Sequence, residues 1–81
     1  MKKRFYLTNY RIQKSLTQKQ VAEAMDVAVS SYNRIENGYR GELMNAEKLV
    51  RLADCLEIDI RQLCFDEIAY QAKKRKNFNT M

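Results

Sequence analysis

The residues best suited to chemistry in this chain are side chains that share one side of a short predicted helix. Val29, Ser30, Asn33 and Arg34 are spaced i, i+1, i+4 and i+5, which places them on one helical face. The amide of an asparagine and the guanidinium of an arginine can each form paired hydrogen bonds, with adenine and guanine respectively. Valine can contact a thymine methyl group. The pattern therefore predicts a face that reads base edges in double-stranded DNA.

Catalysis is not expected from this sequence. The chain has no histidine, and neither paired carboxylates suited to a pocket nor a glycine-rich phosphate loop is evident, so an acid–base pair or nucleophile is missing. Cys55 and Cys64 lie nine residues apart with no metal-ligand spacing and no signal peptide before them, which predicts reduced packing thiols in a cytoplasmic protein. We expect no metal, no cofactor and no membrane span.

Charge is distributed unevenly along the 81 residues, whose formal net charge is +5. Residues 1–41 carry eight Lys or Arg against three Asp or Glu, residues 42–72 carry three against seven, and residues 73–81 carry four against none. Basic charge gathered in this way favours a polyanionic partner, with nucleic acid ahead of a membrane surface. The runs KKR at 2–4 and KKRK at 73–76 are interpreted as solvated ends in preference to DNA-contacting arms.

Two closely spaced helices must hold the polar face in place. A capping box formed by Thr17 and Gln20 predicts a helix over about 17–25, and Asp26 ends it in a left-handed conformation. A second helix then runs from residue 28 or 29 to 36, where an Asn-Gly pair stops it. A connection this short fixes a large angle between the helices and lets the second one protrude. Tyr32 and Ile35 lie on its other side and are predicted core residues.

Three further helices complete one all-α domain. A helix over residues 5–14 is predicted to bury Leu7, and Asn45 is placed to cap a helix that continues to Leu56. Asp59 and Gln62 repeat the capping-box spacing and predict a short fifth helix. The segment after Phe65 has only a thin apolar stripe, and we expect a basic C-terminal tail at 73–81, mobile from about Lys74.

At this point the sequence resembles the Cro/cI-type (XRE family) helix-turn-helix proteins. The resemblance covers residues 7–65 and is carried by a set of motifs in order: Arg11, Leu16-Thr17-Gln18 with Val21-Ala22, Arg34-Ile35-Glu36-Asn37-Gly38, and the later run Leu49, Leu52-Ala53, Leu56, Ile58 and Leu63. It implies a five-helix lambda-repressor-like DNA-binding domain over residues 1–72, with the helix-turn-helix at about 17–36. Glycine and Ser or Thr are usual where this chain has Asp26 and Ala28, and the loop after Gly38 is about two residues longer than the family's.

The resemblance also implies roles for individual residues. Val29, Ser30, Asn33 and Arg34 fall on the family's base-facing positions. A second group falls where the family contacts phosphate or the minor groove: Gln18, Lys19, Asn37, Tyr39 and Arg40. The family's glutamine at the position of Gln18 also supports the groove contacts. Arg11 and Glu36 match a partly buried ion pair that ties the first helix to the end of the recognition helix.

The function that follows is a sequence-specific regulator of transcription, most simply a small repressor that occupies an operator as a homodimer. Phe65 and Ile68 are predicted to lie in the dimer surface, because they come after the core pattern is complete. Two alternatives stay open from sequence. The chain could be an antitoxin or a restriction–modification controller that regulates its own promoter, or a protein-interaction module on the same fold.

Overall fold

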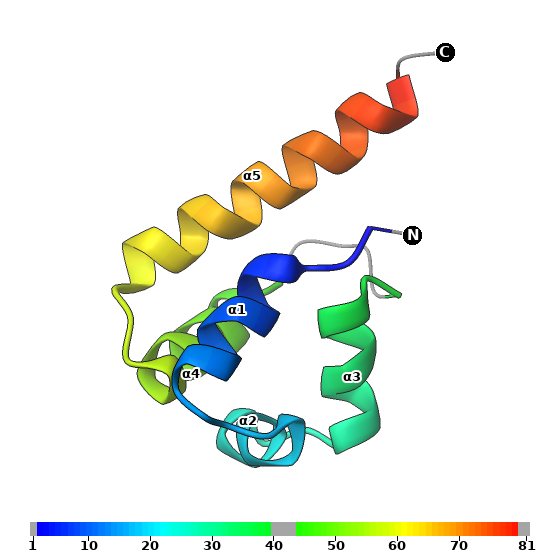
Figure 1. The fold of residues 1–81 in the computed structure, drawn as a ribbon. Helices are drawn as coiled ribbons and strands as arrows, with labels where there is room; N and C mark the ends of the chain where they lie inside the picture. The colour runs from blue at the N-terminus through cyan, green and yellow to red at the C-terminus, as the bar shows by residue number, and fades with distance from the viewer. Residues whose placement is uncertain (1, 40–43, 80–81) are drawn as a thin grey trace.

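The described chain folds into five helices in the computed structural model (Figure 1). The structure describes the backbone of residues 2–39 and 44–79, with side chains as far as Lys74. The helices are α1 (Phe5–Gln13), α2 (Gln18–Met25), α3 (Val29–Asn37), α4 (Ala46–Leu56) and α5 (Ile60–Asn79). No strand occurs in this part of the chain, and the predicted all-α class is confirmed.

Helix starts are set by side chains that satisfy free backbone amides. The capping box of α2 is complete: the Gln20 amide N donates to Thr17 Oγ1 at 3.1 Å, and the Thr17 amide N donates to Gln20 Oε1 at 2.8 Å. Asn45 Oδ1 accepts from the Lys48 amide N at 2.9 Å and caps α4. Both caps were predicted. Ala28, the N-cap residue of α3, forms no side-chain capping hydrogen bond.

Left-handed residues end three of the helices. Asp26 closes α2 with φ of 60° and Glu57 closes α4 with φ of 58°, while Gly38 closes α3 with φ of 82°. Gly38 is required for a second reason, since a Cβ atom there would lie 1.8 Å from the carbonyl oxygen of Lys2. The helix end and the N-terminal segment therefore meet where only glycine fits.

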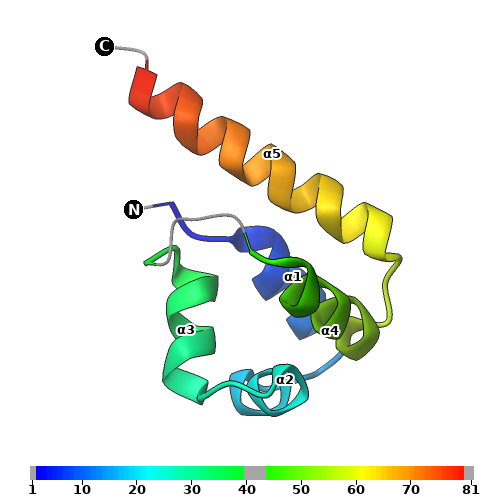
Figure 2. The same cartoon turned by 180° about the vertical axis from the view of Figure 1, so that it is seen from behind.

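One core holds the helices together. In both views α5 lies on one side of the molecule beside α1 and α4, and α2 lies at the opposite end with α3 rising from it at the edge (Figures 1 and 2). Tyr32 and Ile35 are buried as predicted. The core residues are Leu7, Val21, Ala22, Met25, Tyr32, Ile35, Met44, Leu49, Leu52, Ala53, Leu56 and Leu63.

The fifth helix is longer than the sequence predicts. It runs for 20 residues and passes without a break through residue 73, where the basic tail was expected to begin. Asp59 Oδ1 accepts from the Arg61 amide N, but Gln62 donates to Asp66 and does not close the predicted capping box. The division of the chain at residue 72 remains a prediction.

The N-terminal segment is bound to the middle of α5. Arg4 is fully buried and pairs with the equally buried Glu67 of α5, through Nε–Oε1 and Nη2–Oε2 distances of 2.9 Å. Arg4 Nη1 also donates to the carbonyl oxygen of Ile35 at 2.8 Å, and Tyr70 Oη donates to the Lys2 carbonyl oxygen. The interpretation of residues 2–4 as a solvated end is therefore wrong for Arg4, because its charge is matched by a carboxylate from the far end of the chain.

Candidate nucleic-acid interface

The two sides of α3 differ in chemistry and in exposure. Its inner side buries Tyr32, Ile35 and Glu36. On its outer side Val29 is 47% exposed, and Ser30 and Arg34 are exposed. Three of the four predicted base-facing side chains thus reach solvent together on one helix, at an edge of the molecule.

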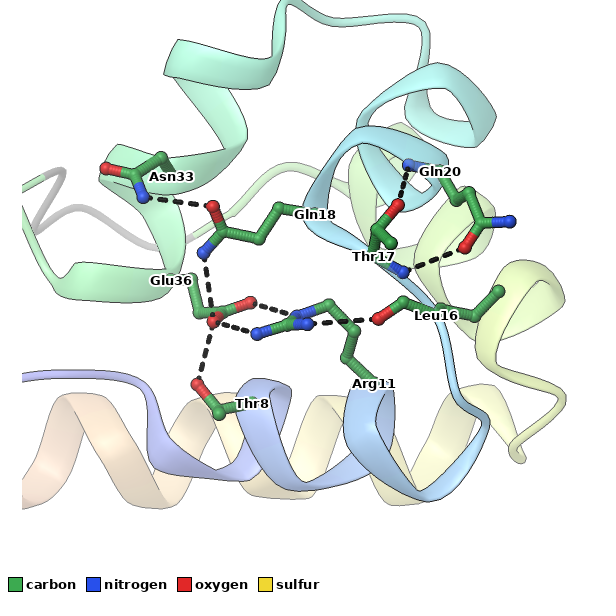
Figure 3. A network of polar contacts seen from close by, with 8 residues as sticks. All are labelled: Thr8, Arg11, Leu16, Thr17, Gln18, Gln20, Asn33 and Glu36. Carbon is green, nitrogen blue, oxygen red and sulfur yellow. Dashed lines mark hydrogen bonds and ion pairs between the residues drawn. The ribbon is translucent and has the colours of Figure 1, made fainter.

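Asn33, the fourth of these residues, is only partly exposed because it bonds to α2. Its Nδ2 donates to Gln18 Oε1 at 3.0 Å, and Gln18 Nε2 donates to Glu36 Oε1 at 3.2 Å. Figure 3 shows Gln18 between the two, with the Asn33 carbonyl oxygen pointing away from it. The first residue of α2 therefore joins a predicted base-contacting residue to a buried carboxylate.

Glu36 is the centre of this polar network. Arg11 Nε donates to Glu36 Oε2 at 2.9 Å, and Arg11 Nη2 donates to Oε1 at 3.0 Å, which confirms the predicted ion pair. Arg11 Nη1 donates to the Leu16 carbonyl oxygen, and Thr8 Oγ1 donates to Glu36 Oε1 (Figure 3). The network ties α1, the start of α2 and the end of α3 to one carboxylate.

The network keeps the Glu36 carboxyl ionised. Burial on its own would raise its pKa, but the hydrogen bond from Arg11, the neighbouring hydroxyl of Tyr32, and the hydrogen bonds from Thr8 and Gln18 outweigh burial and lower the pKa to about 2. A carboxylate that remains charged across the physiological range can only accept hydrogen bonds. Every group that faces Glu36 must therefore be a donor.

The residues predicted to meet phosphate flank the outer side of α3. Gln18 and Lys19 begin α2, where free amide groups favour an anion. Asn37 is partly buried at the end of α3, and Tyr39, just beyond it, is 63% exposed. Arg40 lies outside the described residues.

Free cations are found on this side of the molecule. Within the described ranges Lys19 and Arg34 form no ion pair, and the same holds for Lys48 on α4 and Arg61 on α5. An unpaired arginine on the outer side of α3 retains all five of its N–H groups for a partner. This arrangement suits an anionic surface that also offers hydrogen-bond acceptors.

Other kinds of site find no support in the described residues. These residues contain no cluster of three or more histidine, cysteine, aspartate or glutamate side chains placed to bind a metal ion. Among the described helices, none combines the length and apolar character needed to cross a bilayer. Cys55 and Cys64 are partly buried free thiols that pack against the core.

Sequence reasoning missed the link from Gln18 to Asn33 and to Glu36. The family role predicted for Gln18 was a phosphate contact that also supports the groove contacts, but its two partners, Asn33 and Glu36, were not identified. The side chains of Gln18 and Asn33 are both amides, and amides 15 residues apart give no pattern that marks them as partners. The turn at Asp26 brings the two side chains together, so only the predicted angle between α2 and α3 could have indicated that they are partners.

Comparison with known proteins agrees with this geometry. A family model described as helix-turn-helix matches residues 7–63. The chain belongs to this family, and it is a helix-turn-helix protein of the Cro/cI type.

A named relative adds detail. The chain is 39% identical, over 64 residues, to the cryptic phage CTXphi transcriptional repressor RstR of Vibrio cholerae serotype O1. The match covers 79% of this chain and 55% of the relative, so the chain spans about half the length of the curated protein it matches. No solved structure matches the chain significantly.

Proposed function

We propose that this protein is a sequence-specific, double-stranded DNA-binding regulator that represses transcription by occupying an operator. The observation that carries the proposal is the contrast across α3. Its inner side is fixed by Tyr32, Ile35 and Glu36, and its outer side presents Arg34 without an ion-pair partner among the described residues. A helix held in this way fits the DNA major groove, which is about as wide as one helix.

The roles proposed for individual residues are those that the family resemblance implies. Val29, Ser30, Asn33 and Arg34 contact base edges, while Gln18, Lys19, Asn37, Tyr39 and Arg40 contact phosphate or the minor groove. The relative RstR is named a transcriptional repressor, which supports repression as the outcome of binding. A cytoplasmic location and the absence of catalysis are parts of the same proposal.

The protein is further proposed to act as a homodimer. Phe65 and Ile68 on α5 are 60% and 54% exposed, and Ala72 continues their stripe at the next helical turn. Large apolar side chains grouped on one helix face suit pairing with a second copy. Two domains would read half-sites about 34 Å apart, as helix-turn-helix dimers do.

Selection of bound sequences from a random DNA pool tests the proposed function. Arg34→Ala is expected to relax preference at one base pair per half-site by about 1–3 kcal/mol, the value of a bidentate base contact. Arg51→Ala is the matched control, since it removes an exposed arginine from α4 and should leave preference unchanged. If the wild-type protein enriches no sequence, the proposal is wrong.

Two physical measurements accompany the selection. Affinity for the selected site should fall steeply with salt, with log K decreasing by about 0.9 per log unit of salt for each phosphate neutralised. Light scattering of the saturated complex should show two subunits per duplex, and Phe65→Glu should reduce that number without lowering the melting temperature. One subunit per duplex would rule out the homodimer.

A further inference from the structure

A cavity of about 290 Å³ lies between the N-terminal segment and α5. The N-terminal segment runs beside α5 in both views of the fold (Figures 1 and 2). Sites for small molecules have volumes of about 300–1,000 Å³, so this cavity suits a molecule of the size of a single substituted ring. None of its lining residues belongs to the candidate interface or to the polar network around Glu36.

The wall formed by the N-terminal segment is held in place by the fold. Tyr70 Oη donates to the Lys2 carbonyl oxygen at 2.6 Å, and the Arg4 amide N donates to the Glu36 carbonyl oxygen at 2.9 Å. The buried ion pair of Arg4 with Glu67 fixes the same segment to α5. The cavity is therefore formed before any ligand enters, as most small-molecule sites are.

Positive charge predominates around the cavity. Lys2, Lys3 and Lys73 line it, and none of the three forms an ion pair within the described part of the chain. The acidic residue of the described lining is Asp66, and each of its carboxylate oxygens already accepts a hydrogen bond from a neighbouring side chain. The lining therefore has three ammonium groups against one carboxylate that is satisfied within the fold, and this balance favours an anionic ligand.

Aromatic rings make up most of the remaining lining. Phe5, Tyr6 and Tyr70 contribute them, and Phe5 is 65% exposed. Both tyrosines donate their hydroxyl hydrogens to groups inside the fold, so they offer a ligand mainly ring surface. The Lys3 Nζ atom lies 5.7 Å from the centroid of the Phe5 ring. A positive charge and an aromatic face are thus within reach of the same small molecule.

We propose that this cavity binds a small anionic molecule with one aromatic ring, either an aromatic carboxylate or an aromatic phosphate. The ring of the ligand packs against the aromatic lining, where pairs of rings attract each other beyond the area that they bury. Its anionic group lies toward the lysines. The inference does not rest on the proposed function, because the cavity and the candidate interface share no residue.

Amide signals in two-dimensional ¹H–¹⁵N NMR spectra of the full chain without DNA test the inference, with phenylacetate and phenyl phosphate as the probes. At least one probe should shift the signals of residues 2–6 and 66–73 in a saturable way. Its dissociation constant should be about 5 mM or lower, as expected for a ligand of about ten non-hydrogen atoms. The signals of α2, at the opposite end of the molecule, should not move.

Two neutral or truncated compounds test the ligand class. Phenylacetamide has the same shape as phenylacetate without the charge, and it should bind about 5-fold more weakly. Acetate has the charge without the ring, and it should cause no saturable shift over the same concentration range.

Matched substitutions test the two parts of the lining separately. Phe5→Ala should weaken binding by about 5-fold, whereas Ile12→Ala should not, because Ile12 is 61% exposed on the same helix but does not line the cavity. Lys3→Gln and Lys73→Gln should each weaken binding by about 2- to 5-fold. Lys19→Gln is their control, since it removes an exposed lysine at a distant helix. Melting temperatures of all five variants should match that of the wild-type protein.

Several results would overturn the inference. One is the absence of a saturable shift with either probe, and another is a shift spread evenly over α2 and α5. Equal affinity for phenylacetamide and phenylacetate, or unchanged affinity in both Lys3→Gln and Lys73→Gln, would also overturn it, because the cavity would then not select an anion. These results leave the proposed DNA-binding function intact, and a protein that enriches no DNA sequence leaves this inference intact.

Discussion

Two ion pairs of the same chemistry hold this protein together, and they differ in what they connect. Arg11 and Glu36 are 25 residues apart, with side chains 16% and 1% exposed, and their network extends through Gln18 to the outer side of α3. Arg4 and Glu67 are 63 residues apart, and both are fully buried. The second pair fastens the N-terminal segment to α5 and to the end of α3 without reaching the candidate interface.

The two pairs differ in how much of the hydrogen-bonding capacity of the carboxylate is used inside the fold. The Glu67 carboxylate is also bound by Tyr6 Oη, Gln71 Nε2 and the Met44 amide N, so nearly all its hydrogen-bonding capacity is used inside the fold. Glu36 commits one of its contacts to Gln18, which is partly exposed. The pair of Arg4 and Glu67 is placed to determine stability, whereas the pair of Arg11 and Glu36 is placed to determine stability and the orientation of a surface amide.

Glu67→Ala should produce the largest loss of stability. It leaves the fully buried guanidinium of Arg4 without its carboxylate, and breaking a buried pair from one side costs about 3–5 kcal/mol. Denaturant unfolding of this variant measures the loss, with Glu57→Ala as the control. Glu57 pairs with Lys14 on the surface, where solvent screens the pair and its loss should cost little stability.

The two variants also test how the pairs differ in function. Under conditions where Glu67→Ala remains folded, its base preference should match that of the wild-type protein, because among the described residues no hydrogen bond of Glu67 reaches α2 or the outer side of α3. A change of preference at the Asn33 position in Glu67→Ala would show that the two pairs are not separate in function.

The sequence could reveal one ion pair and not the other for a physical reason. Glu36 follows Arg34 and Ile35 and precedes an Asn-Gly helix stop, so the motif gave it a family role and Arg11 its partner. Glu67 sits on a helix whose inward residues, Leu63, Glu67 and Tyr70, are spaced i, i+4 and i+7. A search for apolar periodicity reads that spacing as a thin stripe, because its middle member is charged.

Local signals predicted the rest of the fold well. The caps at Thr17 and Asn45 and the turn at Asp26 depend on residues within four positions of each other, so the sequence contains all the necessary information. The burial of Arg4 depends on a contact with Glu67, 63 residues away. The predicted base-facing side of α3 was placed correctly as a surface, whereas the link from Asn33 to Gln18 required the angle between two helices.

Acid should weaken the pair formed by Arg11 and Glu36 over a defined range. The pKa of Glu36 is lowered from 4.5 to about 2, so its contribution to stability is complete above about pH 4.5 and is lost as the pH falls toward 2. A shift of this size corresponds to about 3 kcal/mol at most.

Glu36→Gln isolates that contribution. Unfolding free energies measured between pH 5 and pH 2 should fall less steeply in this variant than in the wild-type protein, because one titrating carboxyl is gone. Glu67, whose pKa is also lowered against the effect of burial by its bond with Arg4, continues to titrate in both proteins. If the unfolding free energy of both proteins falls equally steeply with pH, the network does not lower the pKa of Glu36.

Thr17→Ala should have a smaller effect that still reaches the interface. Loss of the cap is expected to cost about 1 kcal/mol, measured by thermal melting. The change should also weaken binding to all DNA sequences alike, since the same helix end presents amides to a phosphate. Asn45→Ala is the matched control, because it removes the equivalent cap from α4 and should lower stability without a comparable effect on binding. An unchanged melting temperature for Thr17→Ala would contradict the role of the capping box.

The smallest effect is expected from Tyr32→Phe, and it gives the finest comparison of the two pairs. Tyr32 Oη is fully buried, and Glu36 and Arg11 lie close enough to act on its pKa. Its geometry nevertheless does not meet that of a hydrogen bond with any group in the described part of the chain. Removing an unsatisfied buried hydroxyl costs little and can stabilise a fold, so the unfolding free energy should change by less than about 1 kcal/mol.

Tyr6→Phe is the matched substitution at the other pair. Tyr6 Oη donates to Glu67, and a hydrogen bond to a buried charged group contributes about 1.5–3 kcal/mol. The two substitutions remove the same atom from the same residue type, each beside a buried arginine–glutamate pair, and chemical denaturation of both variants at pH 7 compares them directly. If Tyr32→Phe loses as much unfolding free energy as Tyr6→Phe, the Tyr32 hydroxyl helps to stabilise the charged form of Glu36. The network around Glu36 would then depend less on Gln18 than the hydrogen bonds indicate.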